Sequence, residues 1–332
     1  MSKAAELASL IGNINAGGGG VNRNLVINGD MSISQRTTSV ASITGAGYHF
    51  IDRYRLGGTV PGTWTLSQST DAPSGQGFGN SLKLDCTASA SQSNGDMMVI
   101  QHKMEGQNLQ GFAKGTSDAK PFALSFWVKS NKTGTYIVTL LDNDNTRHIS
   151  KSYTISAANT WEHKKLTFPA DTTGAFGNDN GASLEIYMWL SAGNNYASGT
   201  LATSWAAVAQ ANYANGQVNL CDSTDNEWFL TGLQLEIGQN PTEFEHEPYD
   251  KTLAKCQRYF FKADEIQYGG YGSSSAADYA TMTFPVTMNH DPDMTGVGSS
   301  NTAQTISVDY AQCYRVGGYA VWDAGATAEA EL

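Results

Sequence analysis

The feature that most constrains the fold is a long succession of short apolar segments separated by turn-forming residues. Between residue 24 and about residue 240, segments such as "FALSFWVKS" and "SLEIYMWLS" alternate apolar and other side chains with a period of two. Stretches such as "SNKTG" and "GNDNG" separate these segments and are rich in residues that favour turns. This pattern predicts a mainly β protein built around a jelly-roll β-sandwich.

Composition narrows the class of partner. Charged residues make up only 15% of the chain, which favours a β-rich surface over helices covered by ion pairs. The 20 basic residues are outnumbered by 31 acidic ones, giving a formal net charge of −11, and no cluster of Lys and Arg occurs. Because nucleic acids and anionic membranes attract basic surfaces, neither is expected as a partner, and no membrane insertion is expected.

The cysteines and the first residues indicate where the chain folds. Cys86, Cys221, Cys256 and Cys313 are far apart and show no metal-binding spacing, so they are predicted to be buried thiols. A disulfide between Cys86 and Cys221 is the alternative. The first twenty residues lack the pattern of a secretory signal, and no apolar stretch is long enough to span a membrane. We therefore expect the chain to be made and folded in the cytoplasm.

Three parts are predicted along the chain. Residues 1–22 contain a short amphipathic helix over residues 2–14, with Ser2 as its N-cap, followed by a flexible tether of glycines at 17–20. A helix this short needs a packing partner, so the segment is expected to join sister subunits or to attach to another protein. A frayed start is the alternative. The apolar stripe consists of Ala4, Leu7, Ala8, Ile11 and Ile14.

The other two parts are β domains. Residues 23–250 are expected to form the jelly roll, and residues 251–332 a small C-terminal β domain. Between them, "PYDKTLAKC" is predicted to form a brief helical turn capped by Asp250. The adjoining "KCQRYFFK" indicates a junction, in which Cys256 packs as a small apolar side chain rather than acting as a reactive thiol.

No motif nominates a catalytic residue. The six histidines form no HExxH pattern and the chain has no GxSxG, so the sequence predicts a protein that is not an enzyme. Paired carboxylates need no fixed sequence spacing, and a polysaccharide depolymerase therefore remains as an alternative. The segment "DNDNTRH" resembles a calcium loop but has Arg147 where the loop requires glycine, which favours a hairpin turn.

Aromatic residues provide the candidate binding site. In "FALSFWVKS" the alternation places Phe122, Leu124, Phe126 and Val128 on the core face, and Trp127 on the other. In "SLEIYMWLS" it places Tyr187 and Trp189 opposite the apolar face formed by Leu184, Ile186, Met188 and Leu190. Exposed aromatics flanked by hydrogen-bonding groups suit stacking on sugar rings or a subunit interface, and Trp127, Tyr187 and Trp189 are the predicted glycan-binding residues. The alternative is that a loop or the N-terminal segment covers this face.

A set of short segments stands in a characteristic order and spacing along the chain: "NLVINGDMSISQR", "DRYRLGG", "VIQHKMEGQNLQGF", "FALSFWVKS", "GTYIVTLLD", "NTWEHKKLTFP", "FLTGLQLEIGQNPTEFEHEPYDKTLAKCQRYF" and a closing "AEL". Taken together, these segments resemble bacteriophage tail-fibre and related virion structural proteins with a carbohydrate-binding-module-like jelly roll. The similarity spans most of residues 24–262, although Tyr54 stands where tryptophan is usual and a long fibrous shaft is lacking.

The resemblance implies a setting, and together with the aromatic residues it gives the leading hypothesis. Such proteins belong to the virion, attach by their N-terminal part and are homotrimers when they form fibres. The hypothesis is a tail fibre or receptor-binding adhesin that contacts host surface polysaccharide. A capsid decoration, head fibre or tail connector with a purely structural role is the alternative. Carbohydrate-binding jelly rolls often hold a structural calcium ion, and the matching positions are Asp30 and Glu236, although both segments also suit an ordinary turn and strand.

Overall fold

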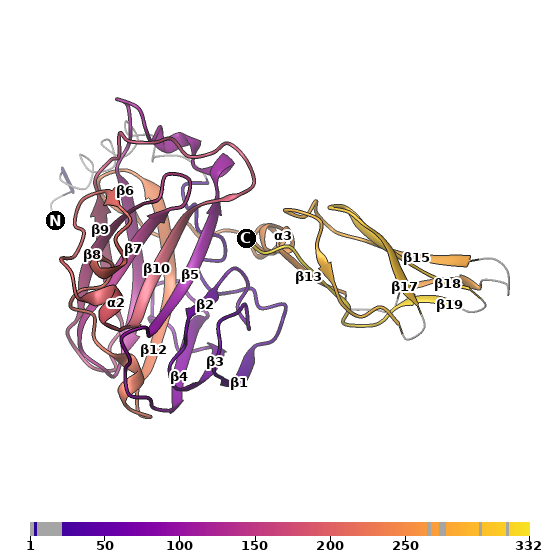
Figure 1. The fold of residues 1–332 in the computed structure, drawn as a ribbon, viewed down its shortest axis with the longest axis horizontal. Helices are drawn as coiled ribbons and strands as arrows, with labels where there is room; N and C mark the ends of the chain where they lie inside the picture. Colours follow the sequence, from indigo (N-terminus) through magenta and orange to yellow (C-terminus); the bar gives the residue numbers. More distant parts are fainter. Residues whose placement is uncertain (1–2, 5–21, 264–266, 272–276, 299–300, 317–318) are drawn as a thin grey trace. The chain divides into compact units, whose positions relative to one another are not determined.

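A computed structural model describes residues 3–4, 22–263, 267–271, 277–298, 301–316 and 319–332. The chain divides into two compact units, Met1–His246 and Glu247–Leu332, so the division falls at His246 rather than at residue 250 (Figure 1). Apart from residues 3 and 4, the predicted N-terminal helix and glycine tether lie outside the described residues. No helix among the described residues is long and apolar enough to cross a membrane.

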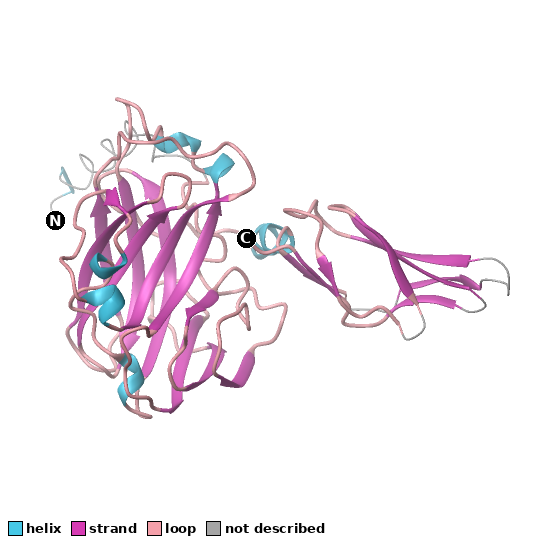
Figure 2. Ribbon diagram, viewed as in Figure 1, coloured by secondary structure: helices cyan, strands magenta, loops and turns pink. Residues whose placement is uncertain are grey.

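Two antiparallel six-stranded sheets form the first unit, and Figure 2 shows that helices contribute only short pieces. Sheet A has the order β1-β3-β4-β12-β6-β9, and sheet B the order β11-β8-β7-β10-β5-β2. The predicted mainly β, jelly-roll sandwich is thus confirmed. Sheet A comprises β1 (Ser39–Ile43), β3 (Thr63–Ser69), β4 (Ser81–Ala88), β12 (Glu227–Ile237), β6 (Phe122–Ser130) and β9 (Glu162–Phe168). Sheet B comprises β11 (Ala206–Ala207), β8 (Arg147–Ile155), β7 (Gly134–Asp142), β10 (Ala182–Ala192), β5 (Met97–Glu105) and β2 (Arg55–Gly58).

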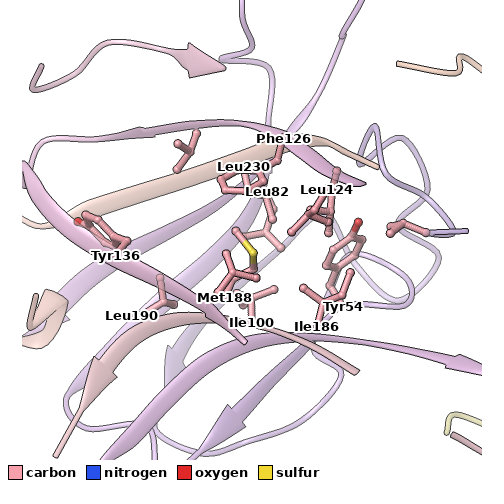
Figure 3. Close-up of a cluster of buried hydrophobic side chains, with 14 of the residues drawn as sticks. Tyr54, Leu82, Ile100, Leu124, Phe126, Tyr136, Ile186, Met188, Leu190 and Leu230 are labelled. Carbon is pink, nitrogen blue, oxygen red and sulfur yellow. The ribbon is translucent and has the colours of Figure 1, made fainter. Parts of the chain in front are cut away.

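The core lies between the inner faces of the two sheets. The side chains that the alternation assigned to the core in β6 and β10 are all buried there, as predicted. Figure 3 shows the middle of this core, where side chains from both sheets interdigitate. Burial of this apolar surface is the main source of the sandwich's stability. The labelled residues are Tyr54, Leu82, Ile100, Leu124, Phe126, Tyr136, Ile186, Met188, Leu190 and Leu230.

Strand β12 contains a bulge that changes which residues face the core. Trp228 and Leu230 point inward before the bulge, and Leu233 and Leu235 do so after it, so the inward positions shift from even to odd numbers. The pairing with β6 shifts between Thr231 and Gln234, and Gly232 between them has a φ of 62°. A single extra residue flips every later side chain, so the bulge keeps both apolar pairs in the core.

A tight turn near the start of the described chain packs against this strand. The side chain of Asn28 donates to the carbonyls of Ile33 and Asp52 and accepts from the amide of Ile33. A Cβ atom on Gly29 would lie 2.2 Å from the carbonyl oxygen of Leu233, so only glycine fits there. The Leu233 amide also donates to the Gly29 carbonyl, at 2.9 Å. The turn and the bulged strand therefore fix each other's position through Gly29 and Leu233.

A buried ionic cluster fixes the loops at one end of the sandwich. The Lys114 ammonium lies 2.6 Å from Asp142 and 3.1 Å from Asp171, and all three side chains are almost completely buried. Arg147 also binds Asp171, with its Nε 2.8 Å from the carboxylate. Lys114 donates further to the carbonyls of Thr173 and Gly174. Each buried charge thus has a partner, which is the condition for tolerating it.

The second unit is smaller and has a thin core. It begins with α3 (Tyr249–Gln257), which has Pro248 rather than the predicted Asp250 at its N-cap and no side-chain cap. Cys256 and Trp322 are fully buried, and much of the surrounding core is alanine. The strands are β13 (Phe260–Lys262), β14 (Gln267–Tyr271), β15 (Ala277–Thr283), β16 (Asp293–Met294), β17 (Thr302–Ile306), β18 (Tyr310–Val316), β19 (Tyr319–Trp322) and β20 (Thr327–Glu329), in the sheets β13-β20-β16, β14-β19 and β15-β18-β17.

The remaining elements are short. Single helical turns occur at α2 (Asn194–Ala197) and, with 3-10 geometry, at Gly106–Asn108, Gln110–Phe112, Gln210–Asn212 and Leu220–Asp222. All four cysteines are buried thiols outside any disulfide, as predicted, and the alternative disulfide between Cys86 and Cys221 is not formed.

Replacing Lys114 by methionine tests the ionic cluster. K114M leaves two buried carboxylates without their shared cation, so the free energy of unfolding should fall by about 3–5 kcal/mol. The matched control is K132M, because Lys132 pairs with the half-exposed Asp222 at the surface. That change should cost no more than about 1 kcal/mol. Urea unfolding of both variants measures the difference, and equal losses would show that the buried cluster contributes no more to stability than the surface pair.

The same cluster should make the first unit sensitive to acid. Burial by itself raises the pKa of Asp171, but the hydrogen bond from Arg147 and the interactions with Lys114 outweigh it and hold the pKa below 3.8. A carboxyl group with a lowered folded-state pKa stabilises the fold above its unfolded pKa, and the stabilisation is lost as the pH falls. Urea unfolding below pH 4 should therefore show a smaller difference between wild type and K114M than at pH 7.

Candidate functional site

A pocket of about 170 Å³ lies on the outer face of sheet A. It is the best candidate for a binding site because five aromatic side chains, one of them a tryptophan, line it beside polar groups. Strands of the sheet supply its floor, and the two loops at residues 70–80 and 238–246 supply its walls. Its lining residues are Gln76, Phe78, Trp127, His163, Gly232, Glu243, Phe244 and His246.

The floor is built from three neighbouring strands. Trp127 on β6 is paired directly with His163 on β9, and their rings stack with centroids 4.8 Å apart and planes 7° from parallel. On the other side of Trp127 lies β12, in which Thr231 pairs with Trp127 and Gly232 follows it. A Cβ atom there would lie 2.7 Å from the Phe78 ring and 3.1 Å from the Trp127 ring. The space between these two rings exists because residue 232 has no side chain.

Three rings from the two loops form the wall. Phe78 and Phe244 meet edge to face with centroids 5.0 Å apart, and His246 lies 5.0 Å from Phe244 and 5.2 Å from Phe78. Edge-to-face contacts of this kind are favourable and hold the rings in defined orientations. The wall is therefore ordered although both loops lie on the surface.

Hydrogen bonds clamp the loop of residues 238–246 to the bulged strand. The buried Glu236 carboxylate accepts from the Thr242 amide at 2.6 Å and from its hydroxyl at 2.8 Å. Glu245 in turn accepts from the backbone amides of Asn22 and Asn24, at 2.7 and 2.8 Å. The loop that carries Phe244 is thus fixed on both sides, and the pocket is formed before any ligand arrives.

Charge in the pocket is modest. Burial lowers the pKa of His163, and the nearby Lys165 lowers it further, while Glu243 opposes both effects. At neutral pH His163 is therefore an uncharged imidazole that can both donate and accept hydrogen bonds. The exposed Gln76 and Glu243 add amide and carboxylate groups at the edge. Aromatic faces with such groups around them suit a ligand rich in hydroxyls.

The structure places Trp127 as the sequence predicted, on the outer face of its strand, half-buried in the pocket. Sequence reasoning missed Phe78, Phe244 and His246, because they lie on loops where no periodicity applies. A signal was present nonetheless. Each of the loop segments "GQGFGN" and "TEFEHE" carries a bulky aromatic residue among polar or small neighbours, which is unusual for a solvated loop.

The expected exposure of Tyr187 and Trp189 is wrong. Both point away from the core, as predicted, but Trp189 is fully buried and Tyr187 is 9% exposed. Residues 193–218 fold over this face of sheet B and bring Tyr196 and Tyr213 against Trp189. The Trp189 indole also donates to the Thr139 hydroxyl at 2.9 Å. The alternative of a covering loop is confirmed, and Trp189 cannot stack on a ligand.

The two predicted calcium ligands belong to separate groups. Asp30 accepts hydrogen bonds from the amide and hydroxyl of Ser32, whereas Glu236 is engaged by Thr242 and Gln234. The first turn and the last strand of the sandwich do meet, but they do so through Gly29 and Leu233. Within the described part of the chain, no group of three or more His, Cys, Asp or Glu could hold a metal ion. The shared calcium stays a prediction.

Comparison with known proteins gives remote structural likenesses alone. The chain matches no protein-family model and no curated protein sequence. The solved structures similar to it include the enzymatically active domain of tailspike protein 4 from bacteriophage CBA120, at 15% identity and a TM-score of 0.34. That match covers 64% of this chain and 21% of the tailspike chain.

Two sugar-binding proteins are similar at the same level. A putative sugar-binding protein from Bacteroides thetaiotaomicron is 11% identical to this chain, with a TM-score of 0.32. The match covers 65% of this chain and 100% of the other. A family 11 carbohydrate-binding module from Clostridium thermocellum, in complex with a β-1,3-1,4-mixed-linked tetrasaccharide, is 10% identical with a TM-score of 0.31. It covers 65% of this chain and 99% of its own. The architecture described above rests on this chain's own strand pairing.

Alanine at position 232 should disturb the pocket as well as the backbone. A left-handed φ costs an alanine about 1–2 kcal/mol. G216A provides the control, since Gly216 has a φ of 91° and open space around it. In G232A the new methyl group also presses on the Phe78 and Trp127 rings. This overlap should lower the free energy of unfolding by at least about 1 kcal/mol more than G216A does. Chemical unfolding compares the two variants, and an equal loss would show that the space between the rings is not enforced by Gly232.

Proposed function

We propose that this protein is a non-enzymatic virion structural protein of a bacteriophage, a tail fibre or receptor-binding adhesin, which contacts a host surface glycan through the Trp127 pocket. The observation that supports the glycan contact is the pocket itself. It combines the Trp127 indole and the Phe78 and Phe244 rings with Gln76 and Glu243. Sugar rings present apolar C–H faces and hydroxyl edges, so they match a site with these two kinds of group.

Pre-organisation of the pocket supports the same proposal. The loop that carries Phe244 is clamped by Glu236 and Glu245, and the Phe78 ring packs on both Phe244 and His246. A ligand that finds the rings already in place loses less conformational entropy on binding. The virion setting is supported by the sequence resemblance over residues 24–262. Attachment would use residues 1–22, with assembly as a homotrimer.

One observation favours the alternative of a purely structural role. Among the described residues, the large apolar side chains that are exposed all lie in the second unit, at Tyr249, Tyr279, Tyr310, Val316 and Tyr319. Exposed apolar surface of this kind suits contact with another protein. Immunogold labelling of the phage particle decides between the two roles. Label at the tail tip supports the adhesin, and label over the capsid supports a decoration or head fibre.

Glycan binding can be measured directly. The full chain is applied to an array of purified bacterial surface polysaccharides, beside the variants W127A and Y310A. W127A should lose at least about ten-fold in affinity, because it removes the floor of the pocket. Y310A removes an exposed aromatic of the second unit and should bind as the wild type does.

Three outcomes would contradict the proposal. If W127A still binds glycan, the binding site lies elsewhere. If the wild type binds no glycan on the array, the proposed function is wrong. Release of oligosaccharides from a bound polysaccharide would instead identify a depolymerase.

A further inference from the structure

A second aromatic group lies beside the Trp127 pocket on the outer face of sheet A. Trp161 precedes β9 directly, and it is half-buried rather than covered. Its ring meets Phe229 on β12 edge to face, with centroids 6.1 Å apart. Lys129 on β6 holds its ammonium over both rings, 4.2 Å from the centroid of Phe229 and 5.5 Å from that of Trp161. The pocket lining does not include this group.

Strand register makes the two groups neighbours. Trp127 pairs with Thr231 on one side and His163 on the other, and Lys129 pairs with Phe229. Trp161 comes two residues before His163, as Lys129 comes two residues after Trp127. Residues two apart on a strand point to the same face and are separated by about 6.7 Å. Paired residues thus form two rows across the strands of one open face: Trp127 lies in the first row, with Thr231 and His163, and Trp161 lies at the end of the second row, beside Lys129 and Phe229. The two rows are adjacent.

A carboxylate accompanies the second ring. Asp71 accepts a hydrogen bond from the Trp161 indole at 3.0 Å and pairs with Lys129, yet 47% of its side chain is exposed. Burial by itself raises the pKa of Asp71, but these two partners outweigh it and lower the pKa. Asp71 begins the same loop that carries Phe78, and its carbonyl accepts from Ser81 at 2.6 Å. Each row thus has an aromatic platform with an acidic acceptor nearby, Glu243 in one and Asp71 in the other.

We propose that the Trp127 pocket is one end of a groove that continues over Trp161 beside Asp71. Its ligand is then a sugar chain with at least two adjacent units in contact with the protein, rather than a single terminal sugar. The inference rests on the proposed glycan binding and adds the length of the ligand. The loop of residues 70–80 forms one side of the groove, because it contributes Asp71 to the second row and Phe78 to the first.

Chain-length dependence tests the groove. The probes are oligosaccharides of one to six sugar units cut from the polysaccharide that the full chain binds on the array, and calorimetry measures their affinity. W161A should weaken binding of the longest oligosaccharides about ten-fold, which corresponds to about 1.4 kcal/mol. Its affinity for the single sugar should change less than about two-fold. W127A should weaken binding at every length.

The control is W205A, because Trp205 is also a half-buried tryptophan whose indole donates a hydrogen bond, to the Pro169 carbonyl, and it lies outside the pocket lining. It should bind all lengths as the wild type does. Melting curves establish that each variant is folded. Should W161A not fold, D71N keeps the side-chain volume and should show the same length-dependent loss.

The outcomes separate this inference from the proposed function. If W161A and D71N bind every length normally while W127A does not, the groove is wrong and the pocket stands. A loss in W161A that is equal for one unit and for six also overturns the groove, since both rings would then contact a single sugar. If W127A binds normally, or no polysaccharide binds at all, both the function and the groove are wrong.

Discussion

The bulge in β12 is the constraint on which the rest of the first unit depends. By inserting Gly232 between Thr231 and Gln234, it keeps Leu233 and Leu235 in the core and turns Gln234 and Glu236 outward. The outward pair then clamps the loop that carries Phe244. On the same strand the backbone of Leu233 receives the turn at Gly29. One extra residue thus determines the packing of the core, the position of the first turn and the shape of the pocket.

The two outer faces of the sandwich differ in whether loops cover their aromatic residues. Sheet B carries Trp189, but residues 193–218 close over it, and His148 and Tyr213 complete the covered layer. Over sheet A the loops stop at the edges of the aromatic rows, so Trp127 and Trp161 stay half-exposed. An aromatic residue on the outer face is therefore not by itself a binding residue. Whether a loop buries it decides between added stability and recognition.

The sequence was sufficient for the sandwich and for Trp127, because strand periodicity reports which face a side chain takes. It also held a signal of the bulge in "EWFLTGLQLEI", since the alternation of apolar and polar residues at Leu233, Leu235 and Ile237 is out of phase with Trp228 and Leu230 before the Thr-Gly pair. The burial of Trp189 could not be predicted, because loops fold back by contacts that have no period. For the same reason Phe78, Phe244 and Asp71 were missed: they reach the site from loops whose path depends on tertiary packing.

A crystal structure of the full chain with the best-binding oligosaccharide from the array would show whether the Trp127 pocket binds sugar. Density for sugar rings is expected against Trp127, over the gap left by Gly232, within reach of Gln76 or Glu243. Sugar density on the covered face of sheet B, or on the second unit with the Trp127 pocket empty, would show that this pocket is not the binding site.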